Sequence, residues 1–247
     1  MYKVSRYILA LGAIAIAVVS STACASDPPN EAVVKVAGHP ISKATLDHWI
    51  PIEAILTYEL YPKRPVPRGV VPDPPNYTAC IAYLEAAPAK LVQSGSKPTA
   101  AQLKSQCRQK YELMQEHMLD FLITSQWVND ESIALGVKLT SREVKQEFER
   151  IKREVFPVKG AFQRFLEFTG LSLSDELFRI RKDLLDTKIQ QRISAKKGLS
   201  LAQQQQLLTE FSVAFQKRWV ARTSCRPGYV MVDCRQYKGP RAPGAEI

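Results

Sequence analysis

Few residues in this 247-residue chain have the types and spacing that acid–base or metal chemistry requires. The three histidines are His39, His48 and His117, and none has a Cys, Asp or Glu at metal-ligand spacing. Asp47 and His48 are adjacent, so on a helix they would point to different faces. The sequence contains no Gly-rich phosphate loop and no nucleophile elbow, and paired carboxylates occur only within charged helix faces. We therefore expect no enzyme, no metal and no cofactor.

The N-terminus has the pattern of a secretion signal, which we assign to residues 1–23. Two basic residues precede an apolar run of 13 residues, which is too short to span a bilayer comfortably. The small residues that follow end in Ala23-Cys24, which resembles a bacterial lipobox with serine where that motif prefers leucine. We expect a lipid on Cys24, a polar tether over 24–31 and an extracytoplasmic, membrane-anchored protein. The alternative is cleavage of the A-x-A pattern Ala23-Cys24-Ala25, which would give a soluble secreted protein.

The cysteine count is consistent with a lipid on Cys24, because five is an odd number for an exported protein. Four cysteines remain for disulfides: Cys80, Cys107, Cys225 and Cys234. Three pairings are possible, and the local one, Cys80 with Cys107 and Cys225 with Cys234, is the simplest. We predict this local pairing. The alternative is four buried free thiols, which is the less common state outside the cytoplasm.

The charge balance favours acidic partners or anionic surfaces. The chain carries 34 Lys and Arg against 24 Asp and Glu, a formal net charge of +10. Basic and acidic residues are interleaved, as they are on ordinary solvated helix faces, and no nucleic-acid reader motif accompanies the charge. We therefore expect no nucleic-acid partner.

One long helix is expected to organise the fold. The stretch from Thr99 to Leu135 begins with the T-x-x-Q capping box of Thr99 and Gln102 and ends before Gly136. Its apolar positions alternate in steps of four and three, and a second apolar line begins after Phe121. Such a helix must be surrounded by other elements. At 1.5 Å per residue it would be about 54 Å long, so the fold should be elongated.

The segments before the long helix predict a small hairpin and short helices. Residues 33–41 read as a short strand and turn or a hairpin, and Ser42 is a candidate cap for the next helix, which Pro51 should kink or end. A Pro-rich loop over 62–75 and a short helix over 76–87 follow, and this helix carries Cys80.

The segments after the long helix predict four more helices. They cover residues 140–156, 161–168, a segment capped by Ser174, and 200–222. The helix after Ser174 has a charged face that we expect to be solvated: Asp175, Glu176, Arg179, Lys182, Asp183 and Asp186. The helix over 200–222 should pack back on the N-terminal helices through Leu208, Phe211, Phe215 and Trp219. The predicted class is all-α with a minor hairpin, comprising a helical domain over 32–222 and a disulfide-containing tail over 223–247.

Three segments, Val33–Lys43, Gly136–Val144 and Ser172–Ile193, form an ordered set. The first segment resembles the short strand and turn that lead into the first helix of SurA/PrsA-type chaperones. The second resembles the link between that family's long helix and its next short helix, and the third is similar to another of its helices. The resemblance to the N-terminal domain of this extracytoplasmic family extends over residues 32–195. It implies a helical chaperone domain that binds unfolded or exported polypeptides.

The same resemblance argues against the catalytic part of that family. Members often carry a parvulin-type prolyl isomerase module before their final helix, whereas only 49 residues follow Gly198 here. We therefore expect a lipid-anchored, chaperone-like protein without the isomerase. Two other interpretations stay open: a protein related to the prolyl isomerases, and a structural or adaptor lipoprotein with one fixed partner.

Overall fold

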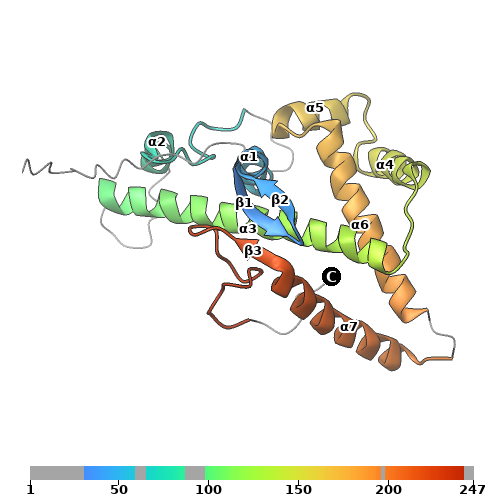
Figure 1. Cartoon of the computed structure of the whole chain (residues 1–247). Helices are drawn as coiled ribbons and strands as arrows, with labels where there is room; N and C mark the ends of the chain where they lie inside the picture. Colours follow the sequence, from blue (N-terminus) through green and yellow to red (C-terminus); the bar gives the residue numbers. More distant parts are fainter. Residues whose placement is uncertain (1–30, 59–64, 87–97, 196–197, 242–247) are drawn as a thin grey trace, which may run out of the picture.

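The computed structural model describes residues 31–58, 65–86, 98–195 and 198–241. The predicted signal peptide, Cys24 and nearly all of the predicted tether lie outside these ranges. The described chain is mainly helical, as predicted, and contains one small antiparallel sheet (Figure 1). In chain order its elements are β1 (Ala32–Val36), β2 (His39–Ser42), α1 (Lys43–Tyr58), α2 (Thr78–Glu85), α3 (Ala100–Ala134), α4 (Ser141–Val155), α5 (Ala161–Thr169), α6 (Leu173–Ser194), α7 (Leu201–Arg222) and β3 (Thr223–Cys225).

Helix α3 is the predicted long helix, and the other elements are arranged along it. Its 35 residues begin at the capping box of Thr99 and Gln102, in which each side chain bonds to the other residue's backbone N–H. At 1.5 Å per residue the helix is about 52 Å long, which makes the molecule elongated. Figure 1 shows α2 beside the start of α3, and α4, α5 and α6 gathered around its far end. The two predicted apolar lines are largely buried, including Met114, Met118, Leu119, Leu122, Ile123, Trp127 and Val128.

The small sheet joins the two ends of the chain. Strands β1 and β2 form the predicted hairpin, and its two-residue turn at Ala37 and Gly38 has positive φ at both positions, as a tight hairpin turn requires. Strand β3 pairs with the other edge of β1, giving the order β2-β1-β3. Residues 223–225, at the start of the predicted tail, therefore continue the sheet of the N-terminal hairpin.

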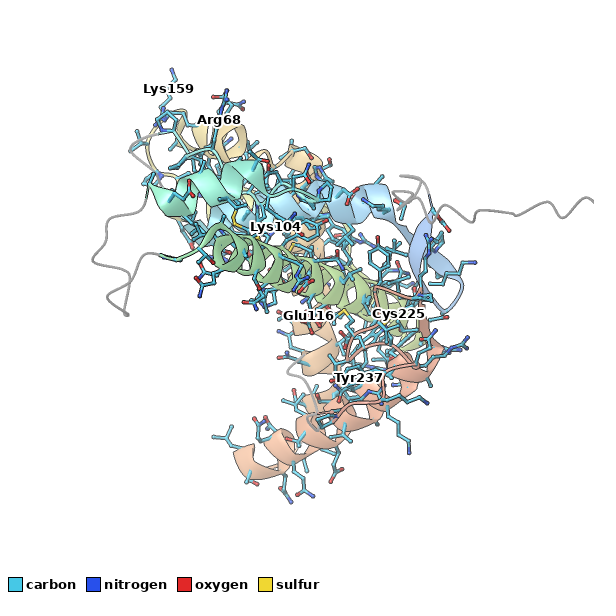
Figure 2. The ribbon with its side chains drawn as sticks, turned by 90° about the vertical axis from the view of Figure 1, so that its left-hand side faces the viewer. Arg68, Lys104, Glu116, Lys159, Cys225 and Tyr237 are labelled. Atoms are coloured by element: carbon cyan, nitrogen blue, oxygen red, sulfur yellow. A yellow bond between two sulfur atoms is a disulfide. The ribbon has the colours of Figure 1, made fainter. Side chains whose placement is uncertain are left out.

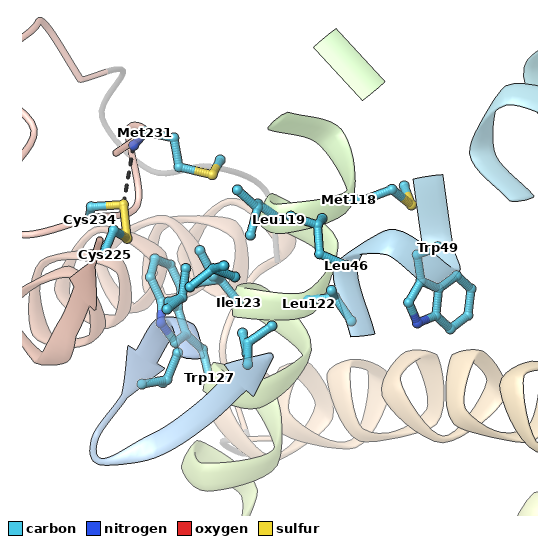
Figure 3. Packing of buried hydrophobic residues seen from close by; sticks show 14 of the residues in the cluster. Leu46, Trp49, Met118, Leu119, Leu122, Ile123, Trp127, Cys225, Met231 and Cys234 are labelled. Carbon is cyan, nitrogen blue, oxygen red and sulfur yellow. Dashed lines mark hydrogen bonds between the residues drawn. A yellow bond between two sulfur atoms is a disulfide. The ribbon is translucent and has the colours of Figure 1, made fainter. Parts of the chain in front are cut away.

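The main core lies where the sheet, α1, α6 and α7 meet the middle of α3. Figure 3 shows Leu46 of α1, Ile123 of α3 and the disulfide of Cys225 and Cys234 around one apolar centre. Met231 is part of the same cluster, and its backbone N–H lies 3.2 Å from Cys234 Sγ. The disulfide loop is thus packed into the core.

Helix α7 packs back on α3 mainly through its C-terminal half. Phe215 and Trp219 are buried, and Phe215 stands edge-to-face against Trp127 at 6.0 Å. Glu131 of α3 is buried and accepts hydrogen bonds from Arg218 Nη2 at 3.0 Å and Trp219 Nε1 at 2.8 Å. The first half of α7 is more open: Leu208 and Phe211 are only partly buried, and Leu201 is 84% exposed.

A smaller cluster fixes α2 and the Pro-rich loop to the start of α3. Cys80 and Cys107 are both buried and form a disulfide. Asp73 accepts hydrogen bonds from the backbone N–H groups of Ala79 and Cys80, so it caps the start of α2. Lys110 of α3 donates from Nζ to the carbonyl of Val70 at 2.7 Å. Loop, helix and disulfide therefore form one unit.

The predicted cap at Ser174 was wrong, and of the two outcomes expected at Pro51, the end of the helix does not occur. Helix α1 continues through Pro51 to Tyr58. Ile50 and Ile52 are both buried, and burying such side chains is worth about 1.5–3 kcal/mol each, enough to offset the roughly 3 kcal/mol that an interior proline costs. Helix α6 is capped by Ser172 instead of Ser174, because Ser172 has Asp175 at the third helical position to complete a capping box.

The predicted solvated face of α6 is also partly wrong. Glu176 and Asp186 are each only 8% exposed, because α6 packs against α3, α4 and α7. Each forms an ion pair with a basic residue of the same helix: Arg179 Nη1 lies 3.1 Å from Glu176, and Lys182 Nζ lies 2.6 Å from Asp186. Charges on this face are therefore paired on the helix itself.

Candidate functional site

A concave surface runs between α1, α3, α6 and the ends of α4 and α5. Its first part is a hollow of about 240 Å³ with an apolar floor of Trp49, Ile52, Leu56, Met118 and Phe121. Its second part is a hollow of about 510 Å³ lined by Leu56, Ile151, Val155, Phe156 and Phe165. Glu53, Leu56 and Arg179 line both hollows, so the two are adjacent. We call this surface the apolar groove.

Three of the five helices around the groove, α1, α3 and α6, supply the first hollow, and α1 and α6 do so with residues at helical spacing. Helix α1 contributes Trp49, Ile52, Glu53 and Leu56, which follow the i, i+3, i+4, i+7 pattern of a single helix face. Helix α6 contributes Glu176, Arg179, Lys182 and Asp183 from one face in the same way. Helix α3 supplies the floor between them. Apolar side chains therefore line the bottom, and charged side chains line the edges.

The floor of the groove is built from interlocking aromatic rings. Trp49 meets Phe121 edge-to-face at 5.1 Å, and Phe121 meets Phe178 edge-to-face at 5.7 Å. In the second hollow, Phe156 and Phe165 lie 5.0 Å apart. Val155, which lines the second hollow, is 49% exposed, and Phe178, whose ring packs against the floor residue Phe121, is 38% exposed, so apolar surface in and beside the groove faces solvent. An exposed apolar surface with a charged rim is typical of a binding site for another chain.

The charged rim carries both signs. Glu53 lies 3.5 Å from the imidazole Nδ1 of His117, and Arg179 pairs with Glu176. Burial raises the pKa of Asp186, although the Lys182 ammonium opposes that shift. Because acids and bases alternate along the rim, the groove has no marked preference for one sign of charge in a ligand.

The four cysteines predicted to form disulfides do not line the groove. The structure pairs Cys80 with Cys107 and Cys225 with Cys234, as the spacing along the chain predicted. The proposed lipidation residue Cys24 is outside the described residues. These two disulfides indicate an oxidising environment outside the cytoplasm.

The three histidines form no common site. His48 Nε2 lies 3.0 Å from Asp175, and His117 is exposed on α3. Within the described ranges, no group of three His, Cys, Asp or Glu side chains is placed to hold a metal ion.

Sequence reasoning missed one pair of carboxyl groups. Asp120 on α3 hydrogen-bonds to Asp233 in the disulfide loop, and Asp233 is only 3% exposed. Burial, followed by the charge of Asp120, raises the pKa of Asp233 to about 7, while Arg241 opposes the shift. Since 113 residues separate the two positions, no local spacing could have indicated the pair. Neither residue lines the apolar groove.

No known protein family, curated protein or solved structure matches this chain. No helix among the described residues is both long enough and apolar enough to cross a membrane.

Proposed function

We propose that this protein binds extended, partly apolar segments of unfolded or newly exported polypeptides outside the cytoplasm. The apolar groove is the observation that carries this proposal. Its aromatic floor offers surface to apolar side chains of many shapes, and its rim of mixed charge offers partners to polar groups. The proposal includes no catalytic step, no cofactor and no nucleic acid.

The dimensions of the groove support a polypeptide ligand. Its two hollows measure about 240 and 510 Å³ and lie next to each other, which suits side chains of one extended segment. Successive side chains of an extended segment point to opposite sides, so every second one can enter the floor. Contacts of this kind depend on apolar area more than on shape, and they therefore favour a broad range of clients.

The proposed address fits the proposed activity. The disulfides place the chain in an oxidising compartment, where exported polypeptides arrive unfolded. A lipid on Cys24 would keep the protein at the membrane from which those polypeptides emerge. The resemblance to SurA/PrsA-type chaperones points to the same activity.

Client breadth is the property that tests the proposal. We expect the purified protein to suppress aggregation of several unrelated unfolded proteins, measured by light scattering after dilution from denaturant. Suppression should rise with the ratio of this protein to client and should not require a nucleotide. If only one of the tested proteins is protected, the adaptor with a fixed partner is the better interpretation. If none is protected, the proposal is wrong.

A further inference from the structure

The last third of α7, strand β3 and the disulfide loop form a strongly basic end of the molecule. From residue 217 to residue 241 the chain has seven basic residues (Lys217, Arg218, Arg222, Arg226, Arg235, Lys238 and Arg241) and a single acidic one, Asp233. This short segment thus supplies six of the ten net positive charges of the whole chain. We call it, together with Lys35 of β1, the basic end.

Most of these charges lie at the surface without a neutralising partner. The side chains of Lys35, Lys217, Arg222, Arg235 and Lys238 are exposed, and none of them forms an ion pair with a described carboxylate. The one acidic residue of the segment is buried, so it presents no carboxylate to solvent there. Two of the other basic residues are paired with carboxylates from outside the segment, Arg218 with Glu131 and Arg226 with Glu31, so the five exposed side chains named above carry the positive charge of this surface.

The basic end is held together as one surface. Lys35 lies opposite Ser224 across the pair of β1 and β3, and the backbone N–H of Arg235 donates to the carbonyl of Thr223 at 2.9 Å. Gln236 donates from Nε2 to Ser224 Oγ at 3.0 Å. In Figure 2 the labels of Cys225 and Tyr237 mark this end, whereas Lys159 lies at the opposite corner of the molecule.

The chain enters the fold at the same end. Glu31 Oε2 lies 2.7 Å from Arg226 Nη1, and the backbone N–H of Arg226 donates to the carbonyl of Val33 at 2.9 Å. Strand β1 starts at Ala32, eight residues after Cys24. Eight extended residues span at most about 28 Å. A lipid on Cys24, as proposed above, would therefore keep the basic end close to the bilayer.

We propose that the basic end binds the anionic headgroups of a lipid bilayer, so that β1, β3 and the disulfide loop face the membrane. Each Lys or Arg near an anionic surface adds about fivefold to affinity, and one lipid chain and a basic patch together anchor a protein far more firmly than either alone. In this orientation Lys159 lies on the side of the molecule that faces away from the bilayer (Figure 2). Helix α5, which follows Lys159 and contributes to the groove, lies on that side as well.

Vesicle co-sedimentation of the protein carrying Cys24→Ser tests this proposal, because the substitution removes the lipid as a cause of binding. We expect binding to phosphatidylcholine vesicles containing about one third phosphatidylglycerol, weakening as ionic strength rises from about 0.05 to about 0.5 M. Neutralising four exposed charges should reduce this affinity by about 100-fold or more. The four substitutions are Lys35→Gln, Lys217→Gln, Arg235→Gln and Lys238→Gln.

The matched control removes the same net charge elsewhere, through Lys104→Gln, Lys145→Gln, Arg153→Gln and Lys159→Gln, all at exposed positions. It should bind anionic vesicles nearly as well as the parent. An equal loss in the control, equal binding to pure phosphatidylcholine, or no binding would overturn the proposal. Tighter binding to duplex DNA or to polyglutamate than to anionic vesicles would overturn it as well. The assay contains no unfolded client, so its failure leaves the groove proposal unaffected.

Discussion

Replacing Asp233 with asparagine should change how the stability of this protein depends on pH. Asp233 is buried against α3, where it meets the carboxyl group of Asp120. Desolvation and the charges of Asp120 and Glu116 favour its protonated form, and the guanidinium of Arg241 opposes them. The pKa of Asp233 rises from 3.8 to about 7, and the pKa of Asp120 is raised as well, mainly by burial. The protonated Asp233 therefore donates a hydrogen bond to Asp120.

The sign of the effect follows from the direction of this shift. Between about pH 4 and pH 7 the folded protein keeps a proton that the unfolded chain has already released. Each pH unit in this window therefore lowers the free energy of unfolding, by at most about 1.4 kcal/mol. The total loss from Asp233 is on the order of a few kcal/mol, and it is complete above pH 7. Asparagine cannot titrate, so the variant should lack this loss.

Denaturant unfolding of both proteins at several pH values measures the difference. The stability of Asp233→Asn relative to the wild type should rise as pH increases from about 4 to about 8. Asp183→Asn is the control, because that side chain is 76% exposed. Glu143, whose pKa is lowered to about 2 mainly by its hydrogen bond with Lys188, is present in all three proteins, so its effect cancels. Parallel curves for Asp233→Asn and wild type would refute the raised pKa of Asp233 and its contact with Asp120.

Three further predictions follow from packing and sequence. Phe215→Ala should lower the free energy of unfolding by about 3–5 kcal/mol in denaturant titration, because Phe215 is only 4% exposed. A loss below about 1 kcal/mol would mean that α7 is loosely attached. Gly69→Ala should destabilise the protein more than Gly136→Ala does. A Cβ at Gly69 would lie 2.1 Å from the carbonyl oxygen of Ala79, whereas a Cβ at Gly136 meets nothing within 4 Å. Equal melting temperatures of the two variants would contradict this prediction. Cys24→Ser should move the protein from the membrane fraction to the soluble fraction at high salt, and a wild type that is already soluble would exclude the lipid.

Local features of the fold could be predicted because they depend on nearby residues. The capping boxes at Thr99, Thr140 and Ser200 need only the right side chain three positions later, and each is present in the structure. The same rule, applied correctly, selects Ser172 over Ser174, because only Ser172 is followed by an acid at that spacing. Pro51 shows the limit of local rules, since tertiary packing outweighs its cost.

The groove and the carboxyl pair could not be predicted in this way. The groove needs side chains from five helices that are separated by long stretches of sequence, and helical periodicity alone does not say which faces meet. Periodicity placed Glu176 on the solvated face of α6, whereas contacts with neighbouring helices bury it. Asp120 and Asp233 meet because the disulfide loop folds onto α3, which no local pattern specifies.

The central claim is that the apolar groove holds unfolded polypeptide, and one comparison tests it most directly. Val155→Asp places a charge at the 49% exposed position in the groove, and Val213→Asp places the same charge at the 42% exposed position on α7, outside it. Binding of a fluorescently labelled, permanently unfolded protein is measured by anisotropy for both variants and the wild type, after equal melting temperatures have been established. A charge facing apolar ligand surface should weaken binding about tenfold or more for Val155→Asp, while Val213→Asp should bind as the wild type does. Equal affinities for all three proteins, or a loss confined to Val213→Asp, would contradict the account.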